Sequence, residues 1–395
     1  MKAQGITSGI AFTRNPIILS GDWNYSPDAS AGVFSLDMNG DRIYDGRFVP
    51  SSGIPSVRVD VSDMADAFSG YFPEVPSGNT EPIVEVADNG ELAGRVVSAY
   101  FDYDTVDGDF EFLAIPGGIS HQNFRKHVEK GKDVFDSRFL ADGCNFFFTT
   151  RTSGWKILIR ETELAPLYFL AYGRNLRIAL TELATGIHVD FGDFAAGIYA
   201  IDLSALRQSF FENHGVLPSA FDIERNGVFA CRVIIGMADV VPERYRLKFR
   251  NSFGFFEIVE ITDALTVVPE YTEEENLRYR LVDPVTGELT TARKRVGCIR
   301  KLTTNIGPIS GDMTNLFLDM LGSDEVWLLD YATEPVKVIP LADSVSFGHR
   351  MTKPVRVPLI LTVAGEDFNI TEDITDALET GRGHVFTKTF KSTFN

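Results

Sequence analysis

Apolar and polar residues alternate with a period of two along much of this chain, which is the pattern of half-buried β-strands. The clearest case, ERYRLKFRNSFGFFEIVEI, begins at Glu243, and cations alternate with apolar side chains in it as far as Arg250. Further strands are predicted at Glu257–Ile261, Leu277–Val282, Gly297–Leu302, Glu325–Asp330, Val336–Ile339 and Val355–Val363. Helical patterns are few and short, and the clearest, Asp312–Leu321, has Asp312 as its predicted cap and Gly322 as its stop. The pattern predicts a mainly β fold with few short helices.

Two stretches of the chain repeat the same order of predicted elements. In each, an alternating strand ends in apolar-Asp-apolar-Ser, at Val59–Ser62 and at Ile201–Ser204. We expect each Ser to cap a short helix. A strand then runs into Asn89-Gly90 or Asn226-Gly227, a dipeptide typical of tight β-hairpins, and a second strand follows. We interpret the match as a duplication.

The length of 395 residues exceeds what one hydrophobic core usually serves, so several domains are expected. The repeat predicts tandem β-sandwich domains, copy 1 at residues 1–112 and copy 2 at 144–242, joined by a helix-bearing connector at 113–143. A C-terminal β-rich assembly domain is predicted at 243–395. Its last residues have apolar points at Val385, Phe386, Phe390 and Phe394, which we interpret as a terminal arm that pairs with a neighbour.

The chain is acidic, with a formal net charge of −18, and such a surface repels phosphate backbones. We therefore expect no nucleic-acid partner. The densest basic run, Arg293–Arg295, is interpreted as a solvated strand face or as a complement to an acidic neighbour, with an anion contact as the alternative. The cationic row of the strand after Glu243 is predicted to contact an acidic neighbouring subunit. That row consists of Arg244, Arg246, Lys248 and Arg250.

Cysteine usage and hydropathy give expectations about redox state and membranes. Cys144, Cys231 and Cys298 are odd in number and widely spaced, which fits neither a disulfide framework nor a zinc site. We expect reduced thiols in apolar surroundings. The first residues lack the apolar run of a secretory leader, and no run of about 18 apolar residues occurs, so neither that export route nor a membrane span is expected.

Short catalytic motifs were not found: there is no G-x-S-x-G, no phosphate-binding loop, no H-E-x-x-H and no C-x-x-C. The six His residues have no metal-ligand spacing, and His121 and His127 lie six positions apart. A hydrolase built on two carboxylates leaves no short motif and is the hardest enzyme class to exclude. We predict no catalytic, cofactor-binding or metal-binding residues, and a protein that is not an enzyme.

Two acidic clusters leave calcium binding open as an alternative. The cluster at Asp37–Asp45 resembles the start of a calcium loop, but Arg42 stands where such a loop needs Gly. A hairpin turn at Asn39-Gly40 explains the same residues. The cluster at Asp102–Asp109 is denser, and an acidic turn at Asp107-Gly108 or the protection of an edge strand explains it equally.

Three segments are similar to those of a known family: ETELAPLYFLAYG (Glu161–Gly173), ERYRLKFRNSFGFFE (Glu243–Glu257) and LGSDEVWLLD (Leu321–Asp330). They resemble tail proteins of phages or prophages from Bacteroidetes hosts. The resemblance, mostly over residues 140–365, implies a distal-tail-like structural component of a tail or baseplate, made in the host cytoplasm and carried in the virion. Its implied partners are copies of itself in a ring or symmetric oligomer and other tail proteins. The tandem β-domains at the front depart from a simple distal tail protein. The alternative function is a non-catalytic array of β-domains that binds carbohydrate or a cell surface.

Overall fold

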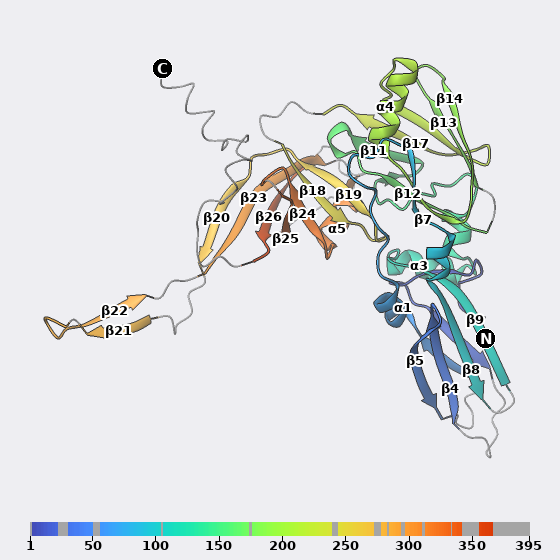
Figure 1. Ribbon diagram of the computed structural model, residues 1–395, viewed down its shortest axis with the longest axis horizontal. Helices are drawn as coiled ribbons and strands as arrows, with labels where there is room; N and C mark the ends of the chain where they lie inside the picture. The colour runs from blue at the N-terminus through green and yellow to red at the C-terminus, as the bar shows by residue number, and fades with distance from the viewer. Residues whose placement is uncertain are drawn as a thin grey trace.

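The computed structural model describes residues 2–22, 31–49, 56–103, 106–173, 176–238, 244–271, 278–282, 284–293, 297–309, 313–332, 334–341 and 355–365. Figure 1 shows three β-rich units, and the prediction of a mainly β, multi-domain fold is confirmed. None of the helices in the described ranges is long and apolar enough to cross a bilayer.

Unit 1 consists of two sheets and one helix. The larger sheet contains, in spatial order, β2 (Ile10–Phe12), β9 (Val106–Ile115), β8 (Val96–Tyr103), β4 (Gly32–Met38) and β5 (Asp41–Phe48). The small sheet contains β1 (Lys2–Ala3), β3 (Ile18–Asp22) and β6 (Ser56–Asp60), and the helix is α1 (Ser62–Ser69). Alternate apolar side chains of both sheets, such as Leu36, Val97 and Leu19, meet in one buried core.

Unit 2 has the same construction. Its larger sheet contains β10 (Thr152–Ser153), β11 (Lys156–Arg160), β17 (Val228–Gly236), β16 (Ala220–Arg225), β13 (Leu176–Glu182) and β14 (His188–Phe194). The small sheet contains β12 (Leu167–Ala171), β15 (Gly197–Ile201) and β7 (Ile83–Ala87), and the helix is α4 (Leu203–His214). Its core includes Phe169, Ile178, Ile201 and Phe221.

The two units share one strand order, as the repeat predicts. In each larger sheet one strand pair is parallel: β2 with β9 in unit 1, and β11 with β17 in unit 2. The next strands in the sheet correspond in order, which are β8, β4 and β5 in unit 1 and β16, β13 and β14 in unit 2. The small-sheet pair β3 and β6 corresponds to β12 and β15, and each pair leads into a helix, α1 or α4.

One predicted hairpin and both predicted caps are wrong. Asn226-Gly227 does join β16 to β17, with positive φ at both residues, but Asn89-Gly90 opens helix α2 (Asn89–Ala93). There the Asp88 side chain accepts a hydrogen bond from the Glu91 N–H while the Glu91 carboxylate accepts one from the Asp88 N–H, a capping box that favours helix over turn. The hairpin equivalent to Asn226-Gly227 is the link between β8 and β9, so β7 and α2 are extra elements of copy 1.

At the N-termini of α1 and α4, an aspartate rather than the predicted serine accepts hydrogen bonds from backbone N–H groups. The Asp202 side chain accepts hydrogen bonds from the N–H groups of Ser204 and Ala205, which makes it the cap of α4. In the first copy Asp60 accepts from the N–H of Ser62, the first residue of α1. The acidic residue lies two positions before each predicted Ser cap and reaches the free donors more directly.

Unit 3 is a seven-stranded sheet with one covering helix. Its strands, in spatial order, are β19 (Phe256–Ile261), β18 (Tyr245–Arg250), β24 (Val326–Leu329), β25 (Val336–Leu341), β26 (Val355–Val363), β23 (Cys298–Ile309) and β20 (Thr266–Tyr271). Helix α5 (Thr314–Gly322) packs Leu316, Phe317 and Met320 into the core. A separate hairpin pairs β21 (Arg278–Val282) with β22 (Leu289–Arg293). The predicted strands and helix of this region are confirmed to within a few residues, except that β23 runs on to Ile309 and the predicted cap Asp312 lies outside the described residues.

Two strands do not follow the predicted domain limits. Strand β9 runs through residue 112 to Ile115, and β7 of the first copy belongs to the small sheet of unit 2. The connector carries helix α3 (His121–Glu129), as expected, and also a one-turn π-helix, η1 (Phe135–Phe139). Units 1 and 2 are therefore joined by a shared sheet as well as by the connector.

Candidate functional site

The three units meet at a set of buried aromatic rings, which we call the junction cluster. Its members are Phe12, Phe135, Phe139, Phe148, Phe253 and Phe255. They come from β2, from η1, from the chain before β10 and from the loop between β18 and β19. The Phe139 ring lies at the centre, with centroids 4.8 Å from Phe148, 5.5 Å from Phe12 and 5.6 Å from Phe253. Edge-to-face and offset contacts of this kind add to the free energy of burying the rings.

Asp133 fixes the start of η1 against the N-terminal loop. Its Oδ2 atom accepts hydrogen bonds from the N–H groups of Thr7 and Ser8, at 2.7 and 2.8 Å, and its Oδ1 atom accepts one from the Phe135 N–H at 2.7 Å. The Asp133 side chain is buried, so these donors replace the water that it would otherwise bind. The arrangement holds the rings of Phe135 and Phe139 in register with β2.

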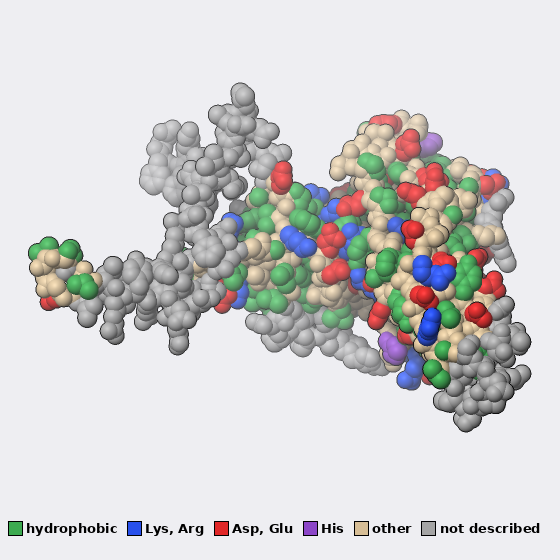
Figure 2. Space-filling model, turned by 60° about the horizontal axis from the view of Figure 1, so that its bottom comes forward, with side chains coloured by type: hydrophobic (Ala, Val, Ile, Leu, Met, Phe, Trp, Pro, Cys, Tyr) green, Lys and Arg blue, Asp and Glu red, His purple; other side chains and the backbone are tan. Residues whose placement is uncertain are grey.

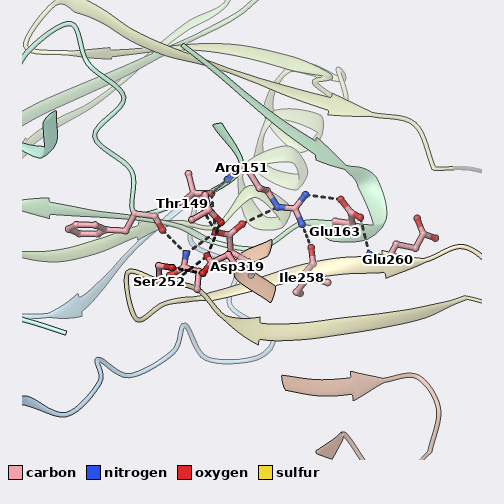
Figure 3. Close-up of polar contacts among 11 residues, drawn as sticks. Thr149, Arg151, Glu163, Ser252, Ile258, Glu260 and Asp319 are labelled. Atoms are coloured by element: carbon pink, nitrogen blue, oxygen red, sulfur yellow. Dashed lines mark hydrogen bonds and ion pairs between the residues drawn. The ribbon is translucent and has the colours of Figure 1, made fainter. Parts of the chain in front are cut away.

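The edge strand β19 of unit 3 is closed by two side chains of unit 2. Arg151 donates a hydrogen bond to the carbonyl oxygen of Ile258, and Glu163, in the 3-10 turn η2 (Glu161–Glu163), accepts one from the Glu260 N–H at 2.9 Å (Figure 3). Arg151 and Glu163 are themselves paired, with Nη1 and Oε2 2.8 Å apart, and both side chains are almost fully buried. This ion pair takes the place of a neighbouring strand and removes a free sheet edge.

Glu257 extends this network towards the start of unit 2. Its carboxylate accepts hydrogen bonds from the Thr149 hydroxyl, the Thr150 N–H and Arg151 Nε, each at 3.1 Å, and from Asn251 Nδ2 at 2.8 Å. A buried carboxylate with this many donors has its hydrogen-bonding capacity satisfied and orients its neighbours. It locks the loop of Asn251 to the chain that enters β10.

Asp319 of α5 completes the polar part of the junction. Its carboxylate accepts hydrogen bonds from the Thr150 hydroxyl and the Ser252 N–H, both at 3.0 Å, and from the Ser252 hydroxyl (Figure 3). Burial is the largest influence on its pKa and raises it, and the negative charge of Glu257 acts in the same direction. The donors from Ser252 and Thr150 oppose this shift, but the pKa of Asp319 remains above its usual value.

The raised pKa of Asp319 predicts a specific pH dependence. The folded chain holds the Asp319 proton to higher pH than the unfolded chain does, so this group makes the free energy of unfolding fall as pH rises from its ordinary pKa through its raised pKa. The Asp319→Asn variant has no such proton and should lack this fall. Urea unfolding of both proteins between about pH 4 and about pH 7 measures the difference. Parallel pH profiles for the two proteins would contradict the assignment.

Unit 1 approaches the same loop through its backbone. Gly117 has a φ of 105°, and a Cβ atom added there would lie 2.5 Å from the carbonyl oxygen of Ser252. The N–H of Gly118 donates a hydrogen bond to that oxygen at 2.7 Å. Only glycine fits at residue 117, because it combines the positive φ with the close contact.

The four predicted assembly residues all have partners within the chain. Arg244 lies 2.9 Å from Glu260, Arg246 lies 2.7 Å from Asp330 and Arg250 lies 2.7 Å from Glu325. Lys248 pairs with Glu74 of the first copy. The predicted contact of this cationic face with a neighbouring subunit stays a prediction, but the face is already neutralised inside the molecule.

The first acidic cluster forms a hairpin turn in the structure. Asn39 and Gly40 have positive φ between β4 and β5, and Arg42 pairs with Asp37. In the second cluster the backbones of residues 102 and 107 are paired between β8 and β9, and residue 104 lies outside the described ranges. Among the described residues, no three or more potential metal ligands lie together. Of the basic run at 293–295, only Arg293 is described, in β22.

The structure brings together an exposed aromatic pair, Trp155 and Phe229, that no local sequence pattern connects. The ring centroids of Trp155 and Phe229 are 5.8 Å apart, and the two side chains are 45% and 41% exposed. The cationic groups of Lys156 and Arg232 lie 4.8 and 5.3 Å from the centre of the Trp155 ring system. All three cysteines are free thiols; Cys231 and Cys298 are buried, as predicted, whereas Cys144 is partly exposed.

Comparison with known proteins does not identify a family. No family model matches the chain, and no curated protein matches it. A solved structure connected with host cell surface retention of a 1.5-MDa bacterial ice-binding adhesin is 10% identical, over 76% of this chain and 90% of that chain, with a TM-score of 0.16. This TM-score is too low to indicate a shared fold. The resemblance to phage tail proteins stays a prediction.

Proposed function

We propose that this protein is a structural subunit of a larger assembly, in which the junction holds its three β-units at fixed angles. The supporting observation is the burial of Arg151, Glu163 and Glu257 between units 2 and 3, with hydrogen-bond partners for all three. Burying paired ions contributes little net stability, but breaking such a pair is costly, so the pair defines one relative orientation. A scaffold needs that property.

A tail or baseplate is the kind of assembly that we propose. The segments that carry the resemblance to phage tail proteins supply Glu163, Asn251 and Glu257 to the junction. Their side chains hold units together, in keeping with the structural role that the resemblance implies. Assembly inside a host cell also fits three free thiols.

Exposed apolar side chains on the third unit are available for contacts with other subunits. On the face shown in Figure 2, hydrophobic side chains gather on the third unit between scattered cations and acids. In that unit Val268 is exposed on the edge strand β20, and Ile339 and Leu341 are exposed on the central strand β25. Exposed apolar groups near one another are typical of interaction surfaces.

The proposal is tested by measuring the size of the purified chain. We expect light scattering after size-exclusion chromatography to show an oligomer whose mass rises with concentration, and negative-stain images to show rings or fibres. A monomer at every concentration, without such particles, would count against a scaffold.

A second candidate function, carbohydrate or cell-surface binding, is favoured by the exposed Trp155 and Phe229 pair. Aromatic faces stack on sugar rings, although Lys156 and Arg232 already lie against the Trp155 rings. A glycan array comparing the native chain with Trp155→Ala tests it: binding that disappears in the variant supports this function, and no binding by the native chain removes it.

A further inference from the structure

The duplication shows how the small sheet of one copy is completed. In unit 2, β15 is the central strand, with β12 on one side and β7 on the other, and all five of its residues are buried. Its equivalent in unit 1, β6, has β3 on one side and is an edge strand of the described sheet. Position for position, the described residues of unit 1 form no counterpart of the strand that β7 supplies to unit 2.

The exposure of β6 agrees with a missing neighbour. Val57 and Val59 contact the core of unit 1 but are only partly buried, and Arg58 and Asp60 are exposed. The equivalent residues of β15, Tyr199 and Ile201, are buried. An open edge with a half-covered apolar row is a surface on which another strand can add.

Strand β7 provides the pattern for the strand that would add. It runs antiparallel to β15, with Ile83 opposite Ile201 and Glu85 opposite Tyr199. The Tyr199 hydroxyl donates a hydrogen bond to Glu85 at 2.9 Å, and the Asp202 N–H donates one to the Pro82 carbonyl at 3.0 Å. A strand next to β6 would gain the same main-chain ladder and would cover Val57 and Val59.

The last residues of the chain have the composition of such a strand. Residues 381–395, outside the described ranges, contain Val385, three Phe and three Thr between 385 and 394, which are residues favoured in strands. Phe386, Phe390 and Phe394 are four positions apart and fall on one side of an extended chain. The segment carries three cations and no acid.

The negative charge of unit 1 favours it as the unit to which the basic segment 381–395 binds. Residues 1–112 contain 6 Lys and Arg against 18 Asp and Glu, a net charge of −12 out of the −18 of the whole chain. A basic C-terminal segment and an acidic N-terminal unit are complementary ends, which favours head-to-tail contact between copies.

We infer that residues 381–395 of a second copy add as an antiparallel strand to β6 of unit 1, as β7 adds to β15. This inference rests on the proposed role as an assembly subunit. It assigns the partner as another copy of this chain and the contact as a main-chain ladder with a row of Phe against Val57 and Val59.

The test compares the full chain with a chain that ends at Thr380. Light scattering should show that the truncated chain associates at least about 10-fold more weakly. Hydrogen exchange should be slower at residues 57–60 in the full chain than in the truncated one. A synthetic peptide of residues 381–395 should bind the truncated chain and restore that protection. The matched control peptide, with Ser at 386, 390 and 394, should not.

The experiment distinguishes a failure of strand addition to β6 from a failure of the scaffold role. If both chains assemble equally and the peptide leaves exchange in β6 unchanged, the inference is wrong while the scaffold proposal stands. If the full chain is a monomer whose β6 is protected only when residues 381–395 are present, the segment binds within its own chain and the second copy is excluded. If both chains are monomers and the peptide does not bind, both proposals fail.

Discussion

Replacing Phe139 by alanine is expected to lower the free energy of unfolding by about 3–5 kcal/mol. Its ring is fully buried and contacts the rings of Phe12, Phe148 and Phe253, which belong to different units. The variant leaves a cavity at the point where the units meet, so the loss should also reduce the cooperativity between them. Calorimetry should show a first unfolding transition at a lower temperature. The unfolding transitions of the units should also be more clearly separated.

The control for this prediction is Phe211→Ala in α4. Phe211 is 52% exposed and lies outside the junction cluster, so its removal should change the free energy of unfolding by no more than about 1 kcal/mol. A Phe139→Ala variant that unfolds like the Phe211→Ala variant would show that the junction cluster does not hold the units together.

Arg151→Met is expected to lower the free energy of unfolding by about 3–5 kcal/mol, because it leaves buried charges without a partner. Glu163 and Glu257 both lose their cation, and the carbonyl of Ile258 loses its donor. Urea unfolding of the full chain measures the loss. Adding Glu163→Gln to Arg151→Met should recover part of the stability, since one buried charge is then removed.

Arg177→Met is the matched control for this substitution. Arg177 pairs with Asp190 on the surface of unit 2, where the two side chains are 58% and 34% exposed. Water and salt screen such a pair, so its removal should lower the free energy of unfolding far less than Arg151→Met does. Equal effects of the two substitutions would mean that the Arg151 network is solvated in solution.

The strands of unit 3 were predictable because side-chain alternation is a local signal. The alternation around Arg246 and Lys248 predicted β18, and the range Val355–Val363 matches β26. Hairpin prediction from Asn-Gly succeeded at Asn226 and failed at Asn89, because the flanking Asp88 and Glu91 supply a capping box that stabilises a helix. Asp88 and Glu91 have the spacing of a capping box, which is a local signal that competes with the hairpin signal of Asn89-Gly90.

The junction could not be predicted in the same way. Arg151 and Glu163 lie about 100 residues from Ile258 and Glu260, and no local pattern relates them. The row of cations at 244–250 was expected to face another subunit, because acids such as Glu74 and Glu325 are brought to it only by folding. A signal did exist for Phe146–Phe148, since a run of three Phe is rarely exposed.

The β class, the repeated order of elements and the acidity of the first copy can be predicted from the sequence, because periodicity and charge are properties of neighbouring residues. The unit that receives β7, the edge strands that are covered and the pairing of the buried ions become known from the fold. Those outcomes depend on contacts between segments far apart in the chain, and their energies arise from burial and packing that exist only after the units have come together.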